Sequence, residues 1–431
     1  MCMKLYIDKE ELRERIRLNF DHLKNDPYYS IEEVFSPADY SWYGDKEGRA
    51  LLAFVSHYKI SGEKIPCMGL MLEQLPGRLN EEGYFGPLYR SDVHEEQLSG
   101  HSWLLRGLCE HYQAFGDAMS LSAIHRITQN LYLPLLGKMA TYPAIRSAKQ
   151  AGGVSGELAE NIDGWILSTD IGCAFMSIDG LSHAYEVTRD AKTKELLDEM
   201  IAVYLSIDKF AMKAQTHCTL TAARGMLRMY RNTSEAKYLH GAEEIFALYV
   251  SGGGMTKTYQ NLNWWDRADS WTEPCAIVDS LMVAAELFKF TQREEYRRLA
   301  ARIYHNGLST SQRDNGGAGT DTLICEGSEH QDLYPLLYEA YFCCSMRMAE
   351  GLWYIDENQD VLWAEQSGTV EKAADHTYRD HDILYGLPDE ALLPYAAEGK
   401  QVDGMTLYPI VKAYKVPRDI LMASRQKIIF D

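Results

Sequence analysis

The 431-residue sequence is poor in basic residues relative to acidic ones and lacks long apolar runs. It contains 43 Lys and Arg against 62 Asp and Glu, which gives a net charge of −19. Nucleic acids and anionic membranes bind clustered basic side chains, so this deficit argues against both as partners. The stretch MCMKLYIDKEELRERIRLNF is charged throughout and has no apolar core of the signal-peptide kind. No run is long and apolar enough to span a membrane, so we expect a cytoplasmic protein.

The sequence also lacks a regular cysteine framework and a phosphate-binding loop. Nine cysteines are an odd number, spread over a large chain. In a reducing compartment they indicate core thiols, metal ligands or nucleophiles rather than disulfides. The glycine-rich stretch AGGVSGE lacks the Lys-Ser/Thr pair of a phosphate loop and is interpreted as a flexible turn.

What the sequence does contain is a repeat of helical hairpins. Each copy has an apolar helix, an aromatic residue, a polar turn such as FGDA or TRDA, and a second amphipathic helix. Apolar residues recur three and four positions apart, which is typical of helices with one buried face. The copies begin at Gly48, Ser99, Ile171, Thr216 and Glu273, and the first half of a sixth covers residues 341–355.

Six helical hairpins can close into an all-α (α/α)6 barrel or stack into an open solenoid. We expect the inner helices to begin with a polar or thiol residue, namely His101, Cys173, His217, Cys275 and Cys343. In a ring such equivalent positions converge on one mouth, whereas in a solenoid they form a line. The barrel is therefore favoured, as a domain of residues 1–355. Residues 356–431 are expected to form a small, polar, β-rich appendage.

Two long segments separate the hairpins, at residues 136–165 and 251–271. Long loops in compact domains often form functional lids or rims. The second segment carries four aromatic residues and two aspartates: Tyr259, Trp264, Trp265, Trp271, Asp266 and Asp269. One interpretation is a rim on which a sugar stacks, and the other is a loop that packs on its own aromatic side chains.

A carboxylate and three thiols are the strongest chemical signal. Glu273 and Cys275 flank Pro274, a residue that suits the first turn of a helix, and Cys343 and Cys344 are adjacent. At a helix start two neighbouring side chains can bend toward one point, and the helix dipole favours thiolates there. Three thiolates and a carboxylate make a four-coordinate site suited to zinc. The alternative for any single cysteine is a buried core thiol.

These residues give the chain a resemblance to glycoside hydrolase family 127, whose characterised members are β-L-arabinofuranosidases. The resemblance covers residues 1 to about 365 and is carried by EGYFG at 82–86, SGH at 99–101, THC at 216–218, TEPCA at 272–276 and the long stretch beginning FCCSM at 342. The Glu-x-Cys pattern followed by Cys-Cys is its most specific mark.

The resemblance implies a retaining glycosidase that acts on a carbohydrate with a non-reducing-end sugar. Zinc would be bound by Glu273, Cys275, Cys343 and Cys344, and Cys343 would be the nucleophile. The expected intermediate is a thioglycosyl enzyme, in which sulfur replaces the usual carboxylate. The resemblance also implies that His217 and His101 bind sugar hydroxyls.

The chain departs from the family at two positions. Lys257 occupies the place of the family's acid/base glutamate, so Asp266 or Asp269 from the same loop would have to supply the proton. Cys173 stands where a sugar-binding histidine is expected. A zinc-containing sugar-binding barrel with impaired catalysis therefore stays open, as does another thiol–zinc (α/α)-barrel enzyme.

Two further points stay open at this stage. Arg347 lies one helical turn after the cysteine pair, where it could steady a thiolate or a carboxylate, or pair with Glu350. The C-terminal tail could pair with another subunit, which would make the protein a homodimer.

Overall fold

The computed structural model describes residues 9–36, 42–145, 158–256, 259–265, 267, 270–320 and 339–359, together with three short strands between 383 and 409. The chain forms two compact units. One consists of Met1–His22 and Ala247–Asp431, and the other of Leu23–Phe246. Among the described residues, no helix has the length and apolarity needed to cross a membrane.

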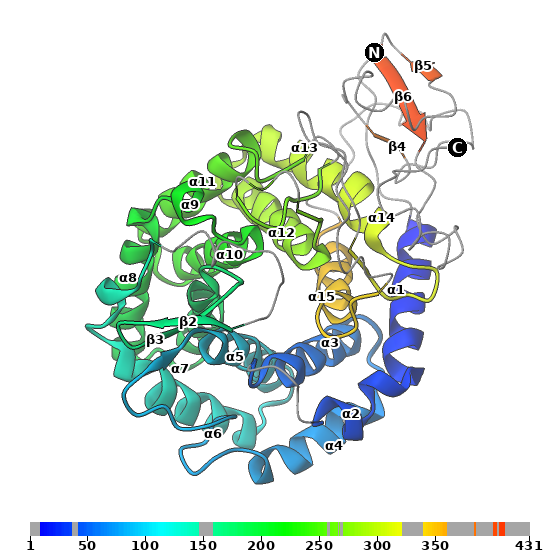
Figure 1. The fold of residues 1–431 in the computed structure, drawn as a ribbon. Helices are drawn as coiled ribbons and strands as arrows, with labels where there is room; N and C mark the ends of the chain where they lie inside the picture. The colour runs from blue at the N-terminus through cyan, green and yellow to red at the C-terminus, as the bar shows by residue number, and fades with distance from the viewer. Residues whose placement is uncertain are drawn as a thin grey trace. The chain divides into compact units, whose positions relative to one another are not determined.

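The unit of Leu23–Phe246 is built of helical pairs, as the repeat predicts. Its helices are α2 (Ile31–Val34), α3 (Asp45–Ser61), α4 (Pro66–Gln74), α5 (Glu95–Phe115), α6 (Ala118–Ile127), α7 (Ser177–Thr188), α8 (Ala191–Ser206), α9 (Lys209–Met212), α10 (Thr216–Thr233) and most of α11 (Ala236–Ser251). The first helices of the pairs, α3, α5, α7 and α10, are almost wholly buried and pack against one another in chain order (Figure 1).

The turns between paired helices share one backbone arrangement. The buried helices end on residues in the left-handed conformation: Gly62, Gly116, Arg189 and Ser234. The backbone N–H of such a residue donates a hydrogen bond to a carbonyl in the last turn of the helix, and the chain reverses direction there. Two of the following helices start on an aspartate cap. The carboxylates of Asp117 and Asp190 accept hydrogen bonds from the backbone N–H of Ser120 and Thr193, at 2.8 and 2.7 Å.

One predicted helix start is wrong. α5 begins at Glu95, so His101 lies almost two turns inside the helix rather than at its opening. The His94 side chain caps this earlier start, because its Nδ1 accepts a hydrogen bond from the Gln97 N–H at 3.3 Å. His217 does lie in the first turn of α10, and Cys173 lies in the 3-10 turn η7 (Cys173–Met176) that leads into α7.

The buried helices of this unit approach one another closely at glycines. A Cβ on Gly180 of α7 would lie 2.5 Å from the backbone oxygen of Ser102, and one on Gly225 of α10 would lie 2.5 Å from that of Ile178. Both distances are shorter than carbon and oxygen atoms tolerate without a backbone shift. The spacing between α5, α7 and α10 therefore depends on these two glycines.

Gly180→Ala is expected to lower the free energy of unfolding by about 2–3 kcal/mol, because the added methyl group must push two helices apart. Gly69→Ala is the matched control. Gly69 is also helical, in α4, but no heavy atom lies within 4 Å of the position of its added Cβ. That change should stabilise the protein by about 0.5–1 kcal/mol. Urea unfolding measures both, and equal stabilities for the two variants would contradict the close-contact explanation.

A small sheet occupies part of residues 136–165, where the sequence predicts a long loop. Its strand order is β1 (Val93–His94), β3 (Trp165–Ser168), β2 (Leu158–Ile162), with β1 parallel and β2 antiparallel to β3. The turn between β2 and β3 is Asp163-Gly164, and both residues have positive φ. An Asp-Gly pair in this conformation is the preferred two-residue connection of a β-hairpin.

The second unit contains the other helices: the greater part of α1 (Lys9–Asn25), α12 (Pro274–Thr291), α13 (Glu294–Arg302), η8 (Ile303–Leu308), α14 (Ser309–Ser311) and α15 (Cys344–Glu357). α1 is the partner of the sixth buried helix, α15. The side-chain amide of Asn19 donates to the carbonyls of Gly316 and Ser345, at 2.9 and 3.1 Å. Arg15 donates to the carbonyl of Ser309 at 2.9 Å.

Three short strands lie in the C-terminal segment, where the sequence predicts a β-rich appendage. Strands β4 (Ile383–Leu384), β5 (Lys400–Val402) and β6 (Met405–Pro409) form an antiparallel sheet in the order β4-β6-β5.

Candidate metal centre

The start of α12 places Glu273 and Cys275. Pro274 occupies the first helical position, and Glu273 before it has extended backbone angles. The side-chain oxygen of buried Asn261 accepts hydrogen bonds from the Glu273 N–H at 2.9 Å and from the Thr272 hydroxyl at 3.2 Å. The segment before the helix is thereby fixed to the preceding loop.

The start of α15 places the two adjacent cysteines. Cys343 precedes the helix and Cys344 is its first residue. The next side chain anchors this turn, because the Ser345 hydroxyl donates to the Glu339 carboxylate at 2.6 Å and accepts from the Ala318 N–H at 2.9 Å. Two neighbouring side chains can converge here because the chain is not yet helical at Cys343.

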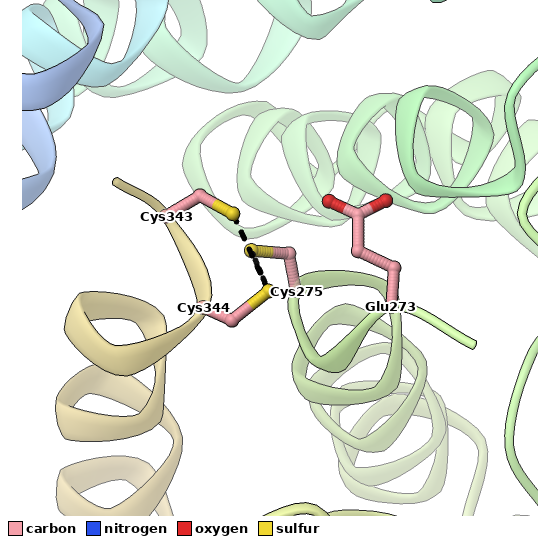
Figure 2. A group of neighbouring side chains, drawn as sticks. All are labelled: Glu273, Cys275, Cys343 and Cys344. Carbon is pink, nitrogen blue, oxygen red and sulfur yellow. Dashed lines mark hydrogen bonds between the residues drawn. The ribbon is translucent and has the colours of Figure 1, made fainter. Parts of the chain in front are cut away.

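The four residues predicted to bind a metal come together (Figure 2). One donor atom from each of Glu273, Cys275, Cys343 and Cys344 lies within 4.8 Å of all the others. The Cys344 sulfur is 3.3 Å from that of Cys343 and 3.7 Å from that of Cys275, too far for a disulfide. All three cysteines are buried, and Glu273 is partly exposed.

The electrostatics of this cluster favour a bound cation. Burial, and next the neighbouring Cys275, raise the pKa values of Cys343 and Cys344 well above the ordinary thiol value. The thiols can ionise together only if a positive charge lies among them. Thiolate sulfurs arranged tetrahedrally around one zinc ion lie about 3.8 Å apart. The Cys275–Cys344 distance of 3.7 Å matches this value, and the Cys343–Cys344 distance of 3.3 Å is shorter. Three soft thiolates with one carboxylate are a donor set that suits zinc. The cluster could therefore hold a metal ion.

His101 lies in the other unit, and both of its ring nitrogens form hydrogen bonds with backbone groups. Its Nδ1–H donates to the Gln97 carbonyl at 2.7 Å, and its Nε2 accepts from the Phe85 N–H at 2.9 Å. Burial lowers its pKa to about 4, so the ring is neutral and both nitrogens are engaged with backbone. His101 thereby holds the EGYFG turn against α5 through both ring nitrogens, and its role in sugar binding stays a prediction.

The other predicted sugar-binding residues are also buried. His217 stacks on Trp103 in its own unit, with ring centroids 5.7 Å apart. Trp264 packs edge-on against Trp271, and Trp265 packs edge-on against Tyr249. Both of these tryptophans have no exposed surface, as in a loop that packs on its own aromatic side chains. Sugar binding by these three residues stays a prediction.

The remaining predicted positions divide into core and undescribed residues. Cys173 belongs to a buried apolar cluster that includes Trp42, Trp103 and Cys218. The candidate acids Asp266 and Asp269, and also Lys257, lie outside the described residues.

Two residues at or near the cluster, Asn261 and Asp279, were not predicted from the sequence. Asn261 has no motif signal, and its contact with Glu273 becomes visible only in three dimensions. Asp279 has no motif signal either, although it lies four residues after Cys275, just as Arg347 lies four residues after Cys343. That equal spacing was the available signal.

Comparison with known proteins identifies the fold. No family model matches the chain, and no curated protein matches it by sequence. A GH127 β-arabinofuranosidase structure matches with a TM-score of 0.55 and 14% identity over 81% of this chain. The chain spans 60% of the length of that protein. Unsaturated glucuronyl hydrolase from Streptococcus agalactiae matches with a TM-score of 0.56 and 13% identity, covering 84% of this chain and 95% of its own.

A third match, cellobiose 2-epimerase from Bacillus thermoamylovorans, has a TM-score of 0.54 and 13% identity and covers 81% of this chain and 98% of its own. At these identities the likeness concerns the fold. The paired helices and these matches together place the chain in the all-α, (α/α)-barrel class predicted from the hairpin repeat.

Proposed function

We propose that this protein is a retaining glycoside hydrolase that uses a zinc-bound cysteine, Cys343, on a non-reducing-end sugar of the β-L-arabinofuranoside type. The observation that carries the proposal is the convergence of Glu273 with three cysteines at two helix starts. The similar solved structures act on carbohydrates, including an arabinofuranosidase, which supports the substrate class.

Cys343 is the best placed of the three thiols to attack a substrate. It retains 6% of its surface, whereas Cys275 and Cys344 retain none. It lies before the first helical residue, beside the exposed side chain of Phe342. A bound zinc ion would keep the cluster's sulfurs deprotonated at neutral pH.

The reaction would proceed in two displacements. The Cys343 sulfur attacks the anomeric carbon, so that a C–S bond forms while the C–O bond to the leaving group breaks and the departing oxygen takes a proton from an acid. Water then attacks the same carbon, breaks the C–S bond and returns a proton to that residue, with net retention. Asp266 and Asp269 are the proposed sources of the proton, from the loop before α12.

A second candidate is a zinc-containing sugar-binding barrel with impaired catalysis. Lys257 at the place of the family's acid favours it. An aryl glycoside with a good leaving group needs little help from an acid. Hydrolysis of such a substrate with retention would exclude this candidate, and tight sugar binding without turnover would favour it.

The first test is the zinc content per chain of purified, reduced protein. We expect about one zinc in the wild type and almost none in Cys275→Ala, because three donors hold the ion too weakly to survive purification. Cys109→Ala is the matched control, since Cys109 is equally buried but lies in α5 of the other unit. It should keep its zinc. A metal-free wild type would exclude the mechanism.

A further inference from the structure

A buried ion pair lies one helical turn beyond the cysteine cluster. Asp279 follows Cys275 by four residues on α12, and Arg347 follows Cys343 by four residues at the start of α15. Residues four apart lie on the same face of a helix, about 6 Å along its axis. The Arg347 guanidinium donates to the Asp279 carboxylate at 2.5 Å.

This ion pair is isolated from solvent and has a third member. Arg347 also contacts Glu350, its neighbour on the next turn of α15. The side chains of Asp279, Arg347 and Glu350 have no exposed surface. The guanidinium therefore connects a carboxylate of α12 to one of α15.

A backbone hydrogen bond within α15 lies on one side of the pair, and a close approach of α15 to α12 lies on the other. The Arg347 N–H donates to the Cys343 carbonyl at 3.0 Å, so the arginine backbone closes the turn that carries the cysteines. One turn further along α15, a Cβ on Gly351 would lie 3.0 Å from the Val278 side chain. The ion pair thus lies between a close helix contact and the cysteine cluster.

Stability alone does not explain a buried ion pair at this place. Removing charges from water costs several kcal/mol per ion, and well-packed apolar residues often stabilise a protein as well or better. An ion pair does fix geometry, because a planar guanidinium binds a carboxylate only within a narrow range of positions.

We propose that Asp279 and Arg347 are positioning residues, whose ion pair fixes the register of α12 against α15 and so keeps the sulfurs of the cysteine cluster at metal-binding distances. This inference rests on the proposed function in one respect, since the metal is the ion that would require that spacing. It adds two residues that do not contact the ion.

The test is titration of the metal-free protein with Co²⁺, whose absorption reports thiolate coordination and its tetrahedral geometry. We expect Arg347→Met and Asp279→Asn to weaken Co²⁺ binding about 10–100-fold, as loss of residues that orient metal ligands commonly does. The d–d bands should also lose intensity. Arg347→Lys, which keeps the charge but not the planar fork, should recover part of the affinity and of the spectrum.

Asp179→Asn is the matched control. Asp179 of α7 is equally buried and forms ion pairs across helices in the other unit, with Arg228 and Arg224 of α10 and Arg106 of α5. Its Co²⁺ affinity should equal that of the wild type. Wild-type affinity and spectrum in both Arg347→Met and Asp279→Asn would overturn the inference. Equal weakening in Asp179→Asn would also overturn it, because the effect would then reflect general destabilisation.

A second measurement separates this inference from the proposed function. Diamide accepts two electrons and two protons from a pair of thiols and leaves a disulfide. The rate at which it joins Cys275 to Cys344 in metal-free protein, followed by peptide mass spectrometry, reports their spacing without any metal. Arg347→Met should slow this reaction several-fold and Asp179→Asn should not. If the wild type binds no Co²⁺ but Arg347→Met still slows disulfide formation, the zinc proposal is contradicted and the positioning role is supported.

If Arg347→Met fails to fold, the double variant Asp279→Leu/Arg347→Met replaces the ion pair by apolar side chains of similar size. We expect it to fold and still to bind Co²⁺ more weakly than the wild type. Wild-type affinity in the folded double variant would overturn the inference.

Discussion

Cys343→Ser lowers kcat for an aryl β-L-arabinofuranoside by about a thousandfold or more, measured at saturating zinc. A serine hydroxyl stays protonated where a zinc-bound thiol would be ionised, and it is the poorer nucleophile and leaving group in the two displacements. Cys343 is also the only one of the three clustered thiols with exposed surface. Initial rates of p-nitrophenol release provide the measurement.

Cys344→Ser is the informative comparison for this prediction, because each variant leaves three donors of the cluster in place. Excess zinc should compensate the weaker binding in both variants, but only Cys344→Ser keeps the attacking sulfur. It should therefore retain measurable turnover and a glycosylated peptide detectable by mass spectrometry. The opposite ranking would assign the nucleophile to Cys344 instead.

Glu96→Gln stabilises the protein at pH 8.5 and changes little at pH 4. Glu96 has no exposed surface, and burial raises its pKa from 4.5 to about 8, even though the Ser168 hydroxyl donates to it at 2.8 Å. The nearby Asp170 and Glu95 carboxylates add to the increase. The folded state thus binds the proton more tightly than the unfolded state does, so wild-type stability falls as pH rises from 4.5 to about 8.

A shift of this size corresponds to about 5 kcal/mol, which is an upper value for the stability gained by Glu96→Gln above pH 8. Urea unfolding at pH 4, 6 and 8.5 gives the profile. Glu186→Gln should behave in the opposite way. Burial alone would raise the pKa of Glu186, but Arg228 and Arg231 lower it to about 2, so that variant should lose stability at neutral pH. A wild-type stability that rises from pH 6 to 8.5, with no gain in Glu96→Gln, would contradict the assignment.

Local signals in the sequence were sufficient to predict the hairpins and the convergence of Glu273 with the three cysteines. Apolar spacing and polar turns predicted the helix pairs, and the turns end on left-handed residues such as Gly116 and Arg189. The cluster could be predicted because Pro274 places Glu273 and Cys275 at a helix start, and because two adjacent cysteines converge only where a helix begins.

Long-range packing decides the surroundings of single residues in ways that the local sequence does not reveal. Whether a tryptophan in a polar loop is exposed or buried depends on partners such as Tyr249, which its own sequence neighbours do not reveal. His101 has the surroundings of a sugar ligand in sequence, but folding brings Phe85 to its free nitrogen. The strands around Asp163-Gly164 did carry a local signal, since Asp-Gly is a hairpin turn, but residues 136–165 were predicted to be a loop.

The pairing of α1 with α15 has a consequence for the order of events during synthesis. Asn19 leaves the ribosome early, yet the carbonyl of Ser345 that it holds is made 326 residues later. Contacts so distant along the chain cannot stabilise a nascent protein, and they form slowly. The turn that bears Cys343 and Cys344 therefore gains this contact only after Ser345 has been made and α1 has come to meet it. The thiols that would bind the metal gain their final geometry only when translation has passed them and the first helix has returned to meet them.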